Sequence, residues 1–164
     1  MTLAQVCVAA TWLTVVAACA GAPKLHDEER AAAGDPDAAH RLCFDYTYGE
    51  RGLARDGFAA RRWCGIGARL GNASAQTLYA QALETDFGGP RSMDSAVFWY
   101  RAAANQQHPH AQYVLGYLYL RGAVPIPSVS AAESLLRASS AQGYDAPELL
   151  LRQIDSARGA AGAP

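Results

Sequence analysis

Apolar positions along this chain recur with a helical period, in segments separated by short turns. In the stretch AQYVLGYLYLRG, residues 111–122, four small or apolar positions fall within one narrow arc at about 100° per residue. Glycine or proline marks the turns, as in GERGLAR, DFGGPR and RGAVPIP. We therefore predict an all-α fold with first helices over 38–48, 73–85 and 109–121, second helices over 57–70, 93–106 and 129–142, and a final helix over 146–157.

This helical pattern repeats with a spacing of 36 residues. Small, core-forming and helix-capping residues coincide in that register: Ala39, Ala75 and Ala111; Trp63, Trp99 and Leu135; Asp56, Ser92 and Ser128. One hairpin cannot bury its own apolar face, whereas stacked hairpins form a continuous core. The repeat thus predicts an α/α solenoid of three hairpins, a capping helix and a disordered tail, over about 34–70, 71–106, 107–143, 144–157 and 158–164.

The third hairpin carries a family resemblance. AQYVLGYLYLRG and FWYRAAANQQHPHAQ resemble the Sel-one-like repeat (SLR), a relative of the tetratricopeptide repeat (TPR). The resemblance covers about residues 34–143, although Phe44 and Ala80 stand where the family has glycine. It implies that Ala111 and Gly116 are small because helices approach closely there, and that a core between units is filled by Leu115, Leu118 and Tyr119.

The same resemblance implies a function. Such repeats are mostly binding surfaces, so we expect a non-catalytic scaffold or adaptor for protein–protein interaction. One alternative is a small-molecule (β-lactam-like) binding or hydrolytic role, with which cysteine-rich exported relatives have been associated. A mainly structural part of an envelope or secretion assembly is another. The sequence shows no serine nucleophile paired with a base, and we expect no enzyme activity.

The N-terminal segment predicts export. Its first twenty residues carry no charged side chain, and their apolar run is short for a membrane span but suits a secretory signal. The end of this run, Val16 to Cys19, resembles the lipobox of bacterial lipoproteins, in which the cysteine is lipidated. We expect a signal peptide over 1–18, lipidation of Cys19, a solvated tether over 19–33 and an envelope location facing the periplasm. Ordinary cleavage after Ala20, giving a soluble periplasmic or secreted protein, is the alternative, and a buried helix is a less favoured third interpretation.

Charge and candidate ligands exclude several classes of function. The chain has 164 residues, with 14 Lys and Arg against 15 Asp and Glu, and no basic block, so we expect no nucleic-acid partner. Arginines 51, 55, 61, 62 and 69 cluster in the first unit, where acidic neighbours offset them, and we interpret them as a solvated face. His108 and His110 lack the further ligands of a zinc site and are interpreted as solvent-facing turn residues. We expect no metal and no cofactor.

Two cysteines remain in the repeats. In the 36-residue register, Cys43 aligns with Tyr79 and Leu115, and Cys64 aligns with Tyr100 and Leu136. Both cysteines are therefore predicted to lie in the packed layer of the first unit. An exported compartment permits a disulfide between them. The alternative is a pair of buried free thiols, which behave as small hydrophobic groups.

A candidate partner site lies on the first helices, opposite their packing face. That arc holds Tyr113, Tyr117 and Leu120, and its equivalents in the other units are largely polar: Arg41, Asp45 and Tyr48, then Thr77, Gln81 and Glu84. Aromatic anchors with a polar rim are typical of binding hot spots. We predict a protein-binding site at Tyr113 and Tyr117, flanked by Arg41, Gln81 and Glu84. Alternatively, the final helix covers both tyrosines with Leu149, Leu150 or Leu151.

Overall fold

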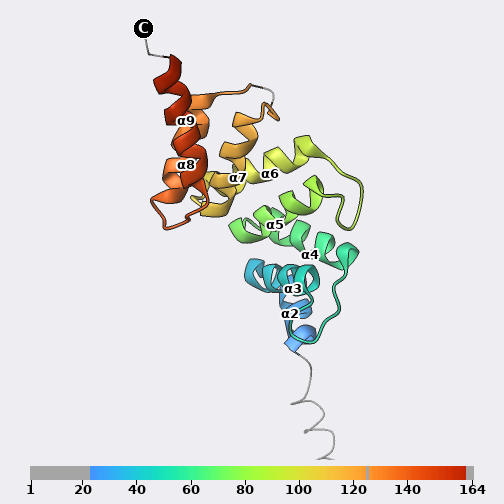
Figure 1. Cartoon of the computed structure of the whole chain (residues 1–164). Coiled ribbons are helices and arrows are strands. Elements are labelled where there is room, and N and C mark those ends of the chain that lie inside the picture. Colours follow the sequence, from blue (N-terminus) through green and yellow to red (C-terminus); the bar gives the residue numbers. More distant parts are fainter. Residues whose placement is uncertain (1–22, 125, 162–164) are drawn as a thin grey trace, which may run out of the picture.

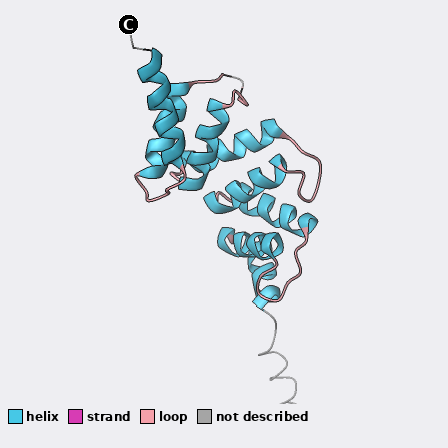
Figure 2. Ribbon diagram, in the orientation of Figure 1, coloured by secondary structure: helices cyan, strands magenta, loops and turns pink. Residues whose placement is uncertain are grey.

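A computed structural model describes residues 23–124 and 126–161 of the chain. These residues form eight helices and no strand (Figures 1 and 2). In chain order the helices are α2 (Pro23–Ala32), α3 (Pro36–Tyr48), α4 (Gly57–Arg69), α5 (Ala73–Glu84), α6 (Met93–Asn105), α7 (Pro109–Leu120), α8 (Val129–Ser140) and α9 (Pro147–Ala161). The predicted all-α solenoid is confirmed, and the six repeat helices lie within two residues of their predicted bounds.

Three antiparallel hairpins make up the array: α3 with α4, α5 with α6, and α7 with α8. Each hairpin stacks on the next through its second helix, so that α4 packs on α5 and α6 packs on α7 (Figure 1). No described helix is long and apolar enough to cross a membrane.

The helix ends follow from local capping. Asp56 and Ser128 each accept a backbone N–H at the start of a second helix, as predicted. Ser92 holds the equivalent position, but it makes no capping hydrogen bond and donates to Ser95 Oγ instead. The first helices are capped by Asp35, Asn72 and His108.

These caps reveal an error in the predicted register. The first-helix caps are 37 and then 36 residues apart, whereas the second-helix caps are 36 residues apart throughout. The turn between α3 and α4 therefore contains one extra residue. Cys43 is equivalent to Ala80 and Gly116, not to Tyr79 and Leu115, and it occupies the small position that was assigned to Phe44.

The predicted core of the third unit is confirmed. Leu115 and Leu118 are buried, and Tyr119 packs against the same cluster. A Cβ on Gly116 would lie 2.9 Å from Cγ of Leu136, which shows how closely α7 approaches α8.

The predicted tether over 19–33 is wrong for the described residues 23–32, which form α2 and pack on α3. Ala31 and Asp27 of α2 are buried. The turn after α2 matches the turns after the second helices: the residue at positive φ is Gly34 after α2 and Gly71 after α4. Thus α2 occupies the place of a second helix on the N-terminal side of the first unit.

The C-terminal boundary also differs from its prediction. Helix α9 continues to Ala161, so the first residues of the predicted tail, 158–161, are helical. Arg158 is held by two hydrogen bonds to the carboxylate of Glu133 on α8, which extends the packing of α9.

Candidate partner-binding site

Cys43 on α3 and Cys64 on α4 form a disulfide, with their Cα atoms 4.7 Å apart. Both side chains are buried in the core of the first unit. In the corrected register, the bridge takes the place of the contact between Gly116 and Leu136 in the third unit. It therefore staples the two helices of the first hairpin.

An ion-pair cluster joins α2 to this hairpin. The buried Asp27 accepts hydrogen bonds from Arg41 Nη2 at 2.8 Å and forms an ion pair with Arg51 Nη1 at 2.8 Å, and Arg51 also pairs with the buried Asp45. Burial raises the pKa of Asp27, but the hydrogen bonds from Arg41 and Arg51 outweigh it and hold this pKa below its usual range. Arg41 thus holds α2 against α3. The prediction that Asp45 lies on a solvent-facing arc is wrong, because this side chain is buried.

The structure does not bring the five predicted partner-binding residues into one group. Arg41 belongs to the α2 cluster, while Glu84 accepts a hydrogen bond from Tyr100 at 2.9 Å. Tyr117 accepts a hydrogen bond from Arg121. Gln81 is exposed. A role in partner binding stays a prediction for these residues.

Tyr113 contacts an aromatic residue that the sequence does not place beside it. Its ring centroid lies 5.5 Å from that of Tyr144, in the turn between α8 and α9. Leu149, one of the leucines expected to cover it, is 66% exposed. Tyr113 is half-buried, so it presents less free aromatic surface than the sequence indicated.

His108 and His110 are half-buried rather than solvent-facing. Burial lowers the pKa of both imidazoles. His108 Nδ1 accepts the backbone N–H of Ala111 and lies 3.2 Å from Thr77 Oγ1, while Nε2 lies 3.4 Å from Ser74 Oγ. The imidazole thus caps α7 and links it to α5. No group of three metal-ligating side chains occurs in the described ranges 23–124 and 126–161.

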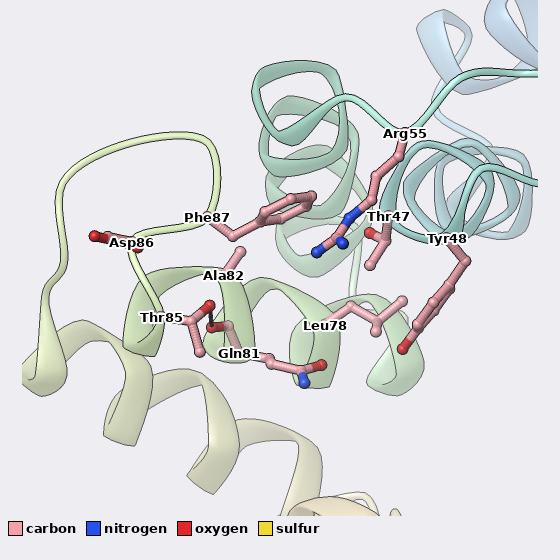
Figure 3. Close-up of a pocket in the computed structure, with 9 residues that line it drawn as sticks. All are labelled: Thr47, Tyr48, Arg55, Leu78, Gln81, Ala82, Thr85, Asp86 and Phe87. Carbon is pink, nitrogen blue, oxygen red and sulfur yellow. Dashed lines mark hydrogen bonds between the residues drawn. The ribbon is translucent and has the colours of Figure 1, made fainter.

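A pocket of about 440 Å³ lies between the first two units, beside the turns within their hairpins. Its lining residues come from the end of α3, from the turn before α4 and from α5 with its following turn: Thr47, Tyr48, Arg55, Leu78, Gln81, Ala82, Thr85, Asp86 and Phe87 (Figure 3). The Arg55 guanidinium carbon lies 4.7 Å from the centroid of the Phe87 ring, a cation–π distance. Of these residues, only Gln81 is predicted from the sequence to belong to a site.

Phe87, which lines one side of the pocket, is held in place because the turn that follows α5 contacts the start of α4. A Cβ on Gly88 would lie 1.8 Å from the backbone oxygen of Gly57, so the two backbones touch and only glycine fits. Arg61 Nη2 also donates to the carbonyl oxygen of Pro90 at 2.8 Å. The turn from the second unit is thereby fixed on the first unit, with Phe87 beside Arg55.

Comparison with known proteins identifies the repeats. The family model described as Sel1 repeat matches three segments: 36–72, 73–108 and 109–144. The first of these is one residue longer than the others, in agreement with the extra residue in the first hairpin.

Two solved structures are similar to the chain. The Sel1 repeat protein from Oxalobacter formigenes is 26% identical, with a TM-score of 0.68, over 79% of this chain and 96% of that one. The second is c5321, a protective antigen present in uropathogenic Escherichia coli strains that displays an SLR fold; it is 27% identical, with a TM-score of 0.73. That match covers 80% of this chain but only 28% of c5321. No curated protein matches the chain.

Proposed function

This chain belongs to the Sel1 repeat family, and from that premise we propose that it is a non-catalytic scaffold for protein–protein interaction in the bacterial cell envelope. Proteins of Sel1 repeats generally act as interaction scaffolds. The observation that supports a binding role here is the pocket between the first two units, where Tyr48 is 51% exposed and the exposed residue Gln81 also lines the pocket. An exposed aromatic ring with polar neighbours is typical of a binding hot spot.

The hydrolytic alternative has weaker support. A serine nucleophile needs a base whose ring is held by a third group, usually a carboxylate. At the contact between Ser74 and His108, the far side of the imidazole faces the Thr77 hydroxyl and the backbone N–H of Ala111. These groups account for His108 as a helix cap, and a binding role therefore fits the site better than hydrolysis.

The proposed function is tested by crosslinking in intact cells and identification of the proteins that co-purify. We expect a stoichiometric protein partner, and we expect Tyr48→Ala to reduce its capture at least about fivefold because truncating a hot-spot aromatic costs more than about 1 kcal/mol. Phe98→Ala is the matched control, because Phe98 is 61% exposed on α6 and does not line the pocket. A monomer without any stoichiometric partner would contradict the proposal.

The envelope location depends on the N-terminal segment. Cys19 and the rest of residues 1–22 lie outside the described residues. The proposal of a lipid anchor is supported by the uncharged apolar run and by its lipobox-like end, Val16 to Cys19. Since α2 begins at Pro23, such an anchor would hold the N-terminal end of the array close to the membrane.

The anchor predicts a specific mature protein. The chain should begin at a lipidated Cys19 and partition into the detergent phase, while Cys19→Ser should be released or remain unprocessed. Intact mass spectrometry of the purified protein measures the outcome. An unlipidated chain that starts at Gly21 would instead establish ordinary secretion.

A further inference from the structure

We propose that the pocket between the first and second units recognises an acidic side chain carried next to an apolar side chain on a partner peptide. This inference rests on the proposed function and names the partner chemistry of the same pocket. It starts from the charge of the lining residues. Arg55 is exposed, and no carboxylate of a described residue forms an ion pair with it.

Two arginines near Arg55 in the chain already have polar partners. Arg51 is neutralised by Asp27 and Asp45, and Arg61 donates to the carbonyl oxygen of Pro90. Arg55 instead lies over the ring of Phe87. An aromatic face leaves the in-plane N–H donors of a guanidinium available, and these donors match the geometry of a carboxylate.

The pocket holds one carboxylate of its own, that of Asp86. Figure 3 shows this side chain directed away from Arg55 and Phe87. The left-handed backbone of Asp86, with φ of 57°, starts the turn that brings Phe87 back toward Arg55. The pocket therefore presents a cation without its own counter-ion.

The remaining lining favours a peptide over a bare anion. Leu78 and Ala82 of α5 provide apolar surface, and the ring of Phe87 adds to it. The carboxamide of Gln81 and the hydroxyl of Tyr48 make no hydrogen bond to another described residue. A carboxamide both donates and accepts, so it can pair with a peptide backbone. The complement is a carboxylate beside an apolar side chain, on an extended chain.

The site is preorganised, which favours binding. Phe87 is fixed through the backbone contact of Gly88 with Gly57, and the turn that carries Arg55 is fixed by the hydrogen bond from the Asp56 N–H to the Tyr46 carbonyl, at 2.9 Å. Because the contact of Gly88 with Gly57 joins two units, the shape of the pocket depends on their relative position.

The test is a selection of random short peptides for binding to the purified full-length protein. The peptides are displayed between fixed flanking sequences, so that none presents a free carboxyl terminus. Enriched peptides should carry Asp or Glu next to an apolar residue, and their binding should weaken at high salt. Arg55→Ala should weaken a selected peptide by about tenfold, because a hydrogen bond to a charged group is lost. Arg55→Glu should reverse the preference toward Lys or Arg.

Arg62→Ala is the matched control, since Arg62 is also exposed and lies 5.0 Å from the centroid of an aromatic ring, that of Trp63, outside the pocket. It should leave peptide binding unchanged. Peptides without acidic residues, no enrichment, or equal binding by Arg55→Ala would overturn the proposal. If acidic peptides fail while crosslinking still captures a partner, only this inference falls; if acidic peptides bind but no partner is captured, the scaffold function falls instead.

Discussion

Loss of the Cys43–Cys64 disulfide is expected to lower the free energy of unfolding by about 3 kcal/mol, because the bridge restricts the unfolded chain over a loop with a sequence separation of 21 residues. In a domain of this size, that corresponds to a fall of about 10 °C in melting temperature. The measurement is thermal unfolding followed by circular dichroism, with and without reductant.

The other units supply a control for this prediction. In the third unit, Gly116 and Leu136 stand at the positions of Cys43 and Cys64. In the second unit, these positions hold Ala80 and Tyr100, so each unit pairs a small residue with a large one. Cys43→Ala with Cys64→Leu should therefore be more stable than the double alanine variant, because leucine fills the space that the sulfur atoms leave. Two free thiols in the unreduced, denatured protein lacking Cys19 would refute the bridge.

The helices could be predicted because their boundaries are encoded locally. Asp56 and Ser128 cap second helices, and glycine adopts the left-handed conformation that ends α3 at Gly49. The register of the first unit could not be predicted in the same way. One extra residue in an exposed turn leaves the apolar pattern of α4 unchanged but shifts α3 by one position. The assignment of Asp45 to the solvent-facing arc failed for this reason.

Helix α2 could not be predicted from the sequence, because charged side chains rather than apolar ones make its contact with the first unit. At the position where α4 has Cys64 and α6 has Tyr100, α2 has Asp27, which is buried by arginines from α3 and the following turn. A sequence such as PKLHDEERAA has the composition of a solvated segment. Its packing depends on partners 14 and more residues away, which a local pattern does not contain.

The pocket could not be predicted from the sequence for a related reason. Arg55 and Phe87 belong to turns of different units, and no spacing within one unit connects them. An apolar residue between Asp86 and Gly88, in an otherwise polar turn, was the one sequence feature that pointed there. Gln81 is exposed, as the sequence predicts. The other residues predicted to share its site instead make separate contacts in different parts of the structure.

Gly67→Val is expected to destabilise the protein by about 3 kcal/mol, at the upper end of overpacking costs, because α4 is seated between two other helices at this residue. Even a Cβ at Gly67 would lie 2.7 Å from Cβ of Ala75 on α5 and 3.5 Å from Cβ of Ala39 on α3. Both alanines are fully buried, so neither helix has room to yield without opening the stack.

Equilibrium urea denaturation measures this effect, and Gly159→Val on α9 is its matched control. A Cβ at Gly159 meets no atom within 4 Å, so the substitution should change stability by less than about 0.5 kcal/mol, given the similar helix propensities of valine and glycine. The contrast separates close packing from the intrinsic cost of valine in a helix. Equal stability of both variants would show that α4 does not lie between α3 and α5, and the stacking of the first two units, on which the pocket depends, would be wrong.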